Sequence, residues 1–417
     1  MRQLCSSGLG QVPFVRRFCA IAGALAIAAL SACANQTPVA PVAPPAAPPP
    51  PPAPHALTGE QPNFFRLDNM PQGQTPVRVG VMLPFSNGSG QTRALAAAMM
   101  KAAELALFDA HNPNILLMSA DAGSTPAQAT AAAQTLLDEG AEVLVGPLFS
   151  QSVAAVAPIA RDHGVPVIAF STDRGVAGDG VYLLSFQPEN EIRRVVTYAA
   201  SQGHTKFAAL VPATAYGQHI AQALQDTAGQ IGAQVVDIEH FSPAGDDLSQ
   251  RAAAVAAAKP DAVLIADGGT NLRTLAPMLV ADGIDPSQVK FLGTGLWNDP
   301  SIIHEETLDG AWFAAPAPET DDAFNTKFQS LYGSAPPQLA TLAYDAISLV
   351  ALLAPGTTYQ RFTPATLTDP DGFAGVDGIF RFDPNGSSQR GLAILGVAPD
   401  GFTVVDPAPV TFQKPAS

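Results

Sequence analysis

From Val77 onward, short apolar runs alternate with longer stretches in which apolar residues recur every three or four positions. Short, mostly apolar runs are typical of strands buried on both faces, and the longer period is typical of amphipathic helices. The first pair is a strand at Val77–Leu83 and a helix over 92–110. Further strands are expected at 114–119, 143–145, 165–170, 181–186, 207–211, 234–238, 262–266 and 291–293. Further helices are expected at 126–140, from 151, and at 190–202, 216–231, 246–258, 271–282 and 338–354.

This order of elements predicts an α/β fold. Strands separated by helices form right-handed βαβ units, which give parallel sheets covered by helices on both faces. The pattern restarts at Phe207, so we expect two doubly wound parallel-sheet lobes. Late in the chain, 378–383 and 392–397 are expected to pair as a hairpin around Pro384-Asn-Gly386.

Residues 1–33 have the composition of a secretion signal. Two arginines precede an apolar segment, Phe18–Leu30, which is well short of the roughly 20 residues that a membrane span needs. The segment runs into Leu30-Ser-Ala-Cys33, which resembles the lipobox of bacterial lipoproteins. That resemblance implies cleavage before Cys33 and lipidation of its thiol. An ordinary cleavage site with a chance cysteine is the alternative.

A proline-rich tract follows the signal. From Pro38 to Pro54 there are 10 prolines in 17 residues, and most of the others are alanine. Such a tract favours an extended polyproline II helix and reaches roughly 50 Å at about 3.1 Å per residue. Residues 34–75 are therefore expected to form a disordered tether. The tether is either a spacer that lifts a folded body off the membrane or an inert linker.

Net charge and the residue after Cys33 bear on localisation. The formal net charge is −15, which argues against nucleic-acid partners and against electrostatic adhesion to anionic lipid. Only acyl chains would then hold the protein at a membrane. In lipoproteins with similar signals, Asp after the cysteine favours retention in the inner membrane. Here Ala34 stands in that position, so we expect an anchor in the outer membrane on its periplasmic side.

Sequence signatures of catalysis are nearly absent. The chain has no phosphate-binding loop, no nucleophile elbow and no pair of histidines at ligand spacing. All three cysteines lie within the first 33 residues, so the folded body contains no disulfide and no cysteine metal site. We therefore expect a protein that is not an enzyme and that needs no metal and no cofactor.

Small polar residues follow several of the expected strands. In open α/β sheets, ligands bind outside the carboxyl ends of the strands, where helix N-termini offer amide donors. If two lobes face one another, these loops line one cleft. The same residue types also cap helices, so each single residue has a simpler explanation. The candidate binding residues are Ser150, Ser152, Ser171, Thr172, Tyr216, Asp267 and Trp297.

Residues 77–405 resemble type I periplasmic binding proteins of the leucine/isoleucine/valine-binding class. The stretches that carry the resemblance are Val79-Gly-Val-Met-Leu-Pro-Phe-Ser86-Asn-Gly, Leu144-Val-Gly-Pro147, Pro166-Val-Ile-Ala-Phe-Ser-Thr172, Ala215-Tyr-Gly217, Ala343-Tyr-Asp-Ala346 and Gly378-Ile-Phe-Arg-Phe-Asp-Pro-Asn-Gly386. The resemblance implies two lobes joined by three hinge crossings that close on a small solute. The crossings are expected near Gly203, Ala314–Pro316 and Gly375–Gly378. Lobe 1 is then 77–203 plus 316–376, and lobe 2 is 204–315 plus 377–405.

The resemblance also implies roles for the candidate residues. Ser150 or Ser152, with Ser171 and Thr172, stand where the class holds a ligand carboxylate. Tyr216 stands where an aromatic side chain of the second lobe covers the ligand. Two further candidates lie in later loops of the second lobe, where amino-acid-binding members carry acidic and aromatic groups. These are Asp267, which is either a counter-ion for a ligand ammonium or a helix cap, and Trp297.

A second group of proteins shares this layout. Penicillin-binding-protein activators are outer-membrane lipoproteins that touch peptidoglycan synthases across the periplasm, and the lipobox, Ala34 and proline tract suit that task. Our main hypothesis is such an activator, with a peptidoglycan synthase as partner. The alternative is the solute receptor of an ABC permease, with a small amino-acid-like ligand. A hydrolase is the third hypothesis, and no nucleophile–base–acid set supports it.

Overall fold

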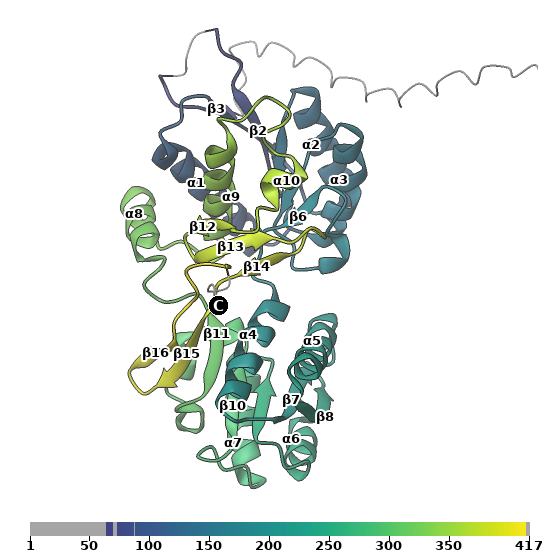
Figure 1. Cartoon of the computed structure of the whole chain (residues 1–417), viewed down its shortest axis with the longest axis vertical. Helices are drawn as coiled ribbons and strands as arrows, with labels where there is room; N and C mark the ends of the chain where they lie inside the picture. Colours follow the sequence, from purple (N-terminus) through teal and green to yellow (C-terminus); the bar gives the residue numbers. More distant parts are fainter. Residues whose placement is uncertain (1–63, 70–72, 87, 414–417) are drawn as a thin grey trace, which may run out of the picture. The chain divides into compact units, whose positions relative to one another are not determined.

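The computed structural model describes residues 64–69, 73–86 and 88–413. The predicted signal, the predicted lipidation site Cys33 and the tract Pro38–Pro54 lie outside these residues. Three sheets and ten α-helices are found in the described part of the chain (Figure 1). Within that part, none of the helices combines the length and hydropathy that a membrane crossing requires.

The first sheet has six strands in the order β1-β3-β2-β4-β5-β6. All neighbours are parallel except β1, which pairs antiparallel with β3. One face packs against α1 and α9 and the other against α2 and α3, as Figure 1 shows. The strands are β1 (Phe64–Phe65), β2 (Val77–Leu83), β3 (Ile115–Asp121), β4 (Val143–Val145), β5 (Val167–Ala169) and β6 (Val181–Leu183). The helices are α1 (Gly90–Ala110), α2 (Pro126–Asp138), α3 (Ser150–Asp162), α8 (Asp322–Tyr332), α9 (Ala340–Leu353) and α10 (Pro364–Leu367).

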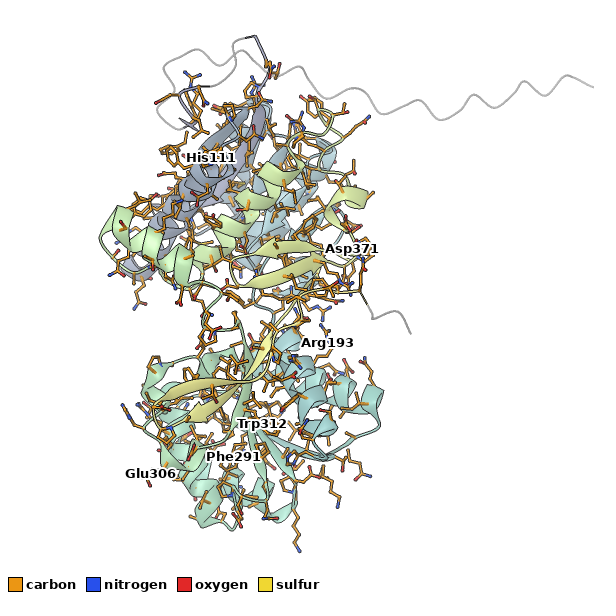
Figure 2. All side chains as sticks on the ribbon, turned by 60° about the vertical axis from the view of Figure 1, so that its left-hand side comes forward. His111, Arg193, Phe291, Glu306, Trp312 and Asp371 are labelled. Atoms are coloured by element: carbon orange, nitrogen blue, oxygen red, sulfur yellow. The ribbon has the colours of Figure 1, made fainter. Side chains whose placement is uncertain are left out.

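The second sheet has seven strands in the order β16-β15-β11-β10-β9-β7-β8. Strands β7 to β11 are parallel, and β15 and β16 add an antiparallel edge. Helices α4 and α5 cover one face, and α6 and α7 cover the other. Phe291 on β10 and Trp312 on β11 are labelled in Figure 2. The strands are β7 (Lys206–Pro212), β8 (Gln234–Phe241), β9 (Ala262–Ile265), β10 (Lys290–Gly293), β11 (Trp312–Ala315), β15 (Ala393–Ala398) and β16 (Gly401–Asp406). The helices are α4 (Pro188–Ser201), α5 (Ala215–Ile231), α6 (Leu248–Ala257) and α7 (Gly269–Ala281).

A third, small sheet consists of β12 (Phe373–Gly375), β13 (Gly378–Phe382) and β14 (Ser388–Arg390), all antiparallel. Its buried residues Phe373, Phe380 and Phe382 belong to the same apolar cluster as α1 and α9. The small sheet therefore packs with the first lobe.

The predicted fold class is confirmed. The structure is α/β, with two parallel-sheet lobes whose helices lie on both faces. Local signals hold as well: Thr125 caps α2 by accepting from the backbone N–H of Gln128, and Pro126 occupies the first turn. Strand Val77–Leu83 has the predicted bounds and is buried at all of its positions.

Two segments pack elsewhere than the expected lobe boundaries put them. Helix α4 packs on the second sheet through Ile192, Val195 and Val196, so the first crossing precedes Pro188 instead of lying near Gly203. Strand β13 packs with the first lobe, although 377–405 was expected in the second. In both cases the apolar face of the element decides which core it joins. The remaining boundaries stay predictions.

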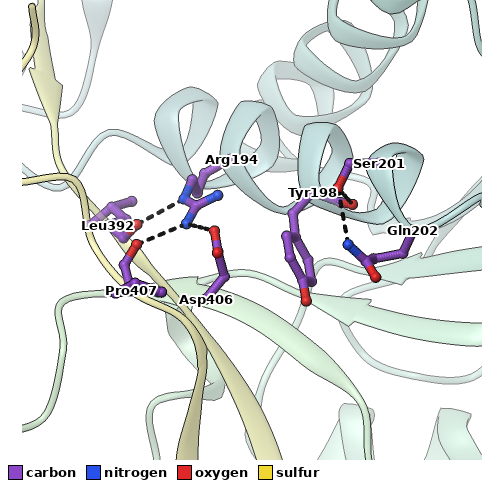
Figure 3. A network of polar contacts seen from close by, with 7 residues as sticks. All are labelled: Arg194, Tyr198, Ser201, Gln202, Leu392, Asp406 and Pro407. Carbon is purple, nitrogen blue, oxygen red and sulfur yellow. Dashed lines mark hydrogen bonds and ion pairs between the residues drawn. The ribbon is translucent and has the colours of Figure 1, made fainter. Parts of the chain in front are cut away.

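Polar contacts between α4 and the last two strands fix the position of this helix. Arg194 on α4 donates from Nε to the backbone oxygen of Leu392 at 2.8 Å and from Nη2 to that of Pro407 at 3.2 Å (Figure 3). The same guanidinium pairs with Asp406 at the end of β16. These bonds join the start of the second lobe to its final hairpin.

Two further expectations were wrong. The hairpin around Pro384–Gly386 exists, but β13 pairs with β14 (Ser388–Arg390), and 393–398 forms β15 in the second sheet instead. The expected tether also extends too far, because Phe64 and Phe65 pair with Met118 and Leu117 at the sheet edge. Phe64 is half-buried and Phe65 is exposed, so it is the pairing with β3 that makes this segment part of the sheet instead of the linker.

Candidate functional site

The first sheet has a topological switch point between β2 and β4. The chain runs from β2 outward to β3 in one direction and from β4 through β5 to β6 in the other. Ligands of open α/β sheets bind at such points, outside the carboxyl ends of the strands. Ser86 follows β2 here, and Gly146 to Phe149 connect β4 to α3.

Asp121, at the carboxyl end of β3, organises the loop after β2. Its carboxylate accepts hydrogen bonds from the backbone N–H of Phe85 at 2.8 Å and of Gly123 at 2.9 Å, and from the hydroxyl of Ser86. Burial raises the pKa of Asp121, but the bonds from Ser86, Gly123 and Phe85 together outweigh burial and lower it. Asp121 is thus an ionised loop anchor.

Helix α3 begins beside the switch point without a side-chain cap, because Phe149 stands at its N-cap position. The amides of a first helical turn have no partner within the helix and carry the positive end of the dipole. Ser150 is half-buried there, and Ser152 is only 1% exposed. This end of α3 offers amide donors to an anion, with Ser150 as the more accessible hydroxyl.

The loop after β5 contains the next two predicted residues. Ser171 is buried, and its Oγ accepts from the backbone N–H of Asp173 at 3.1 Å, which fixes the turn. Thr172 is exposed. Asp173 in turn accepts from the N–H of Gly175 and caps a short 3₁₀ turn. Ser171 therefore shapes the loop, and Thr172 presents a hydroxyl at its surface.

The second sheet has the same kind of switch point, between β7 and β9. Tyr216 follows β7, and its hydroxyl donates to Oγ1 of Thr294, after β10, at 3.0 Å. Burial raises the pKa of Tyr216 well above its usual range, and the carboxylates of Glu191 and Asp267 add to the rise. The phenol is therefore a neutral, partly buried hydroxyl beside two acidic groups.

Glu191 belongs to this cluster and was not predicted. It lies in the first turn of α4, and its Oε2 accepts from the backbone N–H of Gly295 at 2.7 Å. Burial, with a smaller contribution from Glu189, raises the pKa of Glu191 to about 7 against the lowering effect of the Gly295 bond. The sequence could have indicated Glu191 only through its position directly after the first crossing between the lobes. It was overlooked because that crossing was expected near Gly203.

The structure separates the remaining two predicted residues by role. Asp267 accepts from the backbone N–H of Gly268 at 2.8 Å and from the side-chain amide of Asn271 at 2.9 Å, so it organises the start of α7. The side chain of Trp297 is fully buried in the second core. Its ring lies against Gly293, and its Nε1 donates to the backbone oxygen of Asp267 at 3.0 Å. Trp297 supports the loop from beneath instead of lining it.

The two switch points thus differ in chemistry. The first has amide donors and hydroxyls, from the start of α3 and the loops after β2 and β5, and its carboxylate, Asp121, already accepts bonds from Phe85, Ser86 and Gly123. The second has a phenol and two carboxyl groups, from Tyr216, Glu191 and Asp267. No group of His, Cys, Asp and Glu side chains suited to a metal ion occurs among the residues whose placement is described.

The sequence matches the model of one known protein family over most of its length. The model of the family described as periplasmic binding protein matches residues 76–401. The chain belongs to this family. Membership places this periplasmic binding protein in the periplasm. The expected resemblance to leucine-binding proteins is borne out in the fold, which solved members of that class share.

Several solved structures of binding proteins share the fold. A Rhodospirillum rubrum protein described as a branched-chain amino acid ABC transporter is 21% identical, with a TM-score of 0.70, over 79% of this chain and 100% of that one. A leucine binding protein from Thermotoga maritima is 19% identical, with a TM-score of 0.57, over 80% and 98%. A solute binding protein of an R. palustris ABC transporter, in complex with benzoate, is 20% identical, with a TM-score of 0.56, over 80% and 97%. At these identities the likeness shows the fold alone.

Among curated proteins, an uncharacterized protein of Rickettsia prowazekii is 23% identical over 153 residues. The match covers 37% of this chain and 40% of that relative, so the chain spans less than half the length of the curated relative it matches.

Proposed function

We propose that this binding protein is the non-catalytic solute receptor of an ABC permease and that its ligand is a small amino-acid-like zwitterion. The observation that carries the proposal is the division of chemistry between the two switch points. Amide donors and hydroxyls at the first suit a carboxylate. The carboxyl groups of Glu191 and Asp267 at the second suit an ammonium.

The family and the solved relatives support this reading better than the activator hypothesis, because those relatives are described as ABC transporter proteins. In this proposal Ser150 and Thr172 contact the ligand carboxylate, with Ser171 and Ser152 positioning their loops. Tyr216 and Glu191 contact the other end of the ligand, with Asp267 beside them. Trp297 keeps only a supporting role, since its side chain has no exposed surface.

Calorimetry of the purified full chain against a panel of amino acids tests the proposal. Ser171→Ala combined with Thr172→Ala is expected to weaken binding at least tenfold, the equivalent of about 1.4 kcal/mol. The matched control removes two exposed hydroxyls on α8, Thr326→Ala with Ser330→Ala, and is expected to bind like the unmodified protein. Absence of heat with every member of the panel would argue against a receptor for amino acids.

The activator hypothesis rests on a separate observation, the lipobox at Cys33 with the proline tract Pro38–Pro54. We propose it as the second candidate, with an outer-membrane lipid anchor and a peptidoglycan synthase as partner. Deleting Pro38–Pro54 removes roughly 50 Å of reach and separates the two functions. Loss of a cell-wall effect with intact uptake would favour the activator, and no change in either would leave the tract without a role. Cys33→Ser is expected to abolish labelling by a fatty-acid analogue.

A further inference from the structure

A cavity lies at the end of the first sheet opposite the candidate solute site. Its volume is about 480 Å³, within the range of roughly 300–1,000 Å³ typical of small-molecule sites. It is lined by residues directly before β4, β5 and β6 and by the segment that connects α9 to α10. These are the amino ends of the strands, whereas the candidate solute site lies at their carboxyl ends. A ligand here would leave that site untouched.

Aromatic side chains form the walls of this cavity. Tyr182 and Phe362 are buried, at 4% and 6% exposure, and Val165 and Pro166 extend the apolar surface. Tyr359 also lines the cavity and is 41% exposed. Three rings therefore border one open space that no side chain of the described residues fills.

The backbone of Tyr359 is held in an unfavourable conformation. Its φ is +58°, a left-handed value that costs a bulky residue free energy. The backbone N–H of Tyr359 donates to Oε2 of Glu142 at 3.1 Å, which ties the residue to the cavity floor. A strained, exposed ring fixed at the border of a cavity is the arrangement found at ligand clamps.

The charged groups of the cavity are already paired. Glu142 lies 3.3 Å from Nε of Arg361, and both side chains are about 5% exposed. Nη2 of Arg161 lies 3.7 Å from Asp179, and this second pair is exposed. No lining charge is left without a counter-charge, so a charged ligand would have to compete with one of these pairs. An uncharged ring would not.

We propose that this cavity binds a small molecule with an uncharged aromatic ring, held between Tyr359 and the wall formed by Tyr182 and Phe362. Aromatic pairs gain free energy beyond burial when rings stack with an offset or meet edge to face. A hydroxyl on the ring can donate to the exposed carboxylate of Asp179 at the cavity border. The site is separate from the solute site and does not depend on the function proposed above.

Titration of the purified full chain with 4-methylphenol, followed by NMR shifts and a crystal soak, tests this site. Tyr359→Gly removes the ring and suits the left-handed backbone, so the variant is expected to fold and to bind at least tenfold more weakly. Tyr359→Phe keeps the ring and is expected to bind within about twofold of the unmodified protein. Lys259→Gly, at another exposed residue with positive φ, controls for glycine itself and is expected to bind normally.

Benzoate is the charged counterpart in the same experiment. We expect that it does not displace 4-methylphenol and that any binding of benzoate is unaffected by Tyr359→Gly. Four results would each overturn the proposal. Three come from the titrations: no saturable binding of 4-methylphenol, equal binding by Tyr359→Gly, or displacement of 4-methylphenol by benzoate at similar concentration. The fourth is a crystal soak that places the ring elsewhere.

Discussion

Replacing Asp377 with Asn is expected to stabilise the protein at neutral pH. Asp377 lies between β12 and β13, is 1% exposed, and its Oδ2 accepts no hydrogen bond from the described residues. The charges that act on Asp377 include the guanidinium of Arg390 and a second carboxylate, Asp345. Arg390 is already engaged, since its Nη1 lies 3.2 Å from Oδ2 of Asp345. The rings of Phe186 and Phe380 flank the guanidinium at 4.9 and 5.4 Å from their centroids. One arginine thus serves two buried carboxyl groups.

The magnitude follows from the pKa of Asp377. Burial raises it, Arg390 and a hydrogen bond from Thr341 lower it, and Asp345 raises it again, which gives a pKa of about 6 against an ordinary 3.8. Each pKa unit corresponds to about 1.4 kcal/mol, so ionised Asp377 costs the folded state about 3 kcal/mol above pH 7. The folded state binds this proton more tightly than the unfolded state, so protonation of Asp377 favours folding. That favourable contribution is lost as pH rises from about 4 to about 6. Asn keeps the shape without the charge.

Urea unfolding measured between about pH 4 and pH 8 tests this reasoning. Asp377→Asn is expected to be about 2–3 kcal/mol more stable than the unmodified protein near pH 7.5 and nearly equal to it near pH 4. Asp400→Asn removes the same charge from an exposed turn and controls for net charge. Parallel pH profiles for the unmodified protein and Asp377→Asn would refute the assignment of a costly buried carboxylate.

Three further predictions use other parts of the structure. Gly217→Ala is expected to destabilise the protein by about 1–3 kcal/mol in thermal melts, since the new Cβ would lie 1.9 Å from the carbonyl oxygen of Pro212. The control is Gly229→Ala, in the same helix with open space around it, which is expected to raise the free energy of unfolding by up to about 1 kcal/mol. Trp297→Phe is expected to lose about 1 kcal/mol with the hydrogen bond from its Nε1, and an unchanged melt would contradict that role. Binding of an amino acid is expected to tighten between about pH 6 and pH 8 as Glu191 ionises, and Glu191→Gln is expected to remove this dependence in calorimetry.

Strands buried on both faces were predictable from the sequence because their signal is local. Val77–Leu83 is apolar at most positions and lies between two helices, so its burial at every position needs no long-range information. Length alone did not decide the outcome, because the three-residue strand Val143–Val145 was predicted with its observed bounds whereas Trp312–Ala315 was missed. Trp312–Ala315 has four residues, and it became recognisable only through its parallel pairing with β10 and its antiparallel pairing with β15.

Helix α8 was missed for a different reason. More than half of the residues in Asp322–Tyr332 are polar. Its only buried residues are Phe324 and Phe328, and one pair at a spacing of four is too little to show a helical period. Those two rings pack into the core that α1 and α9 share, so the helix depends on tertiary burial more than on its own pattern.

The loops of the candidate site were predictable, but the orientation of their side chains was not. A βαβ order dictates that the residues after each parallel strand gather at one edge of the sheet, which is why the loops with Ser171, Tyr216 and Asp267 were found. Trp297 follows β10 by the same rule, yet its ring lies inward because Gly293 has no side chain to fill that space. Glu191 comes from a helix start and reaches the same loop through the amide of Gly295. Sequence position therefore indicates which loops lie where a ligand can bind, whereas contacts between distant residues decide which side chains face that place. For this reason Glu191 is a stronger candidate than Trp297, whose side chain is fully buried.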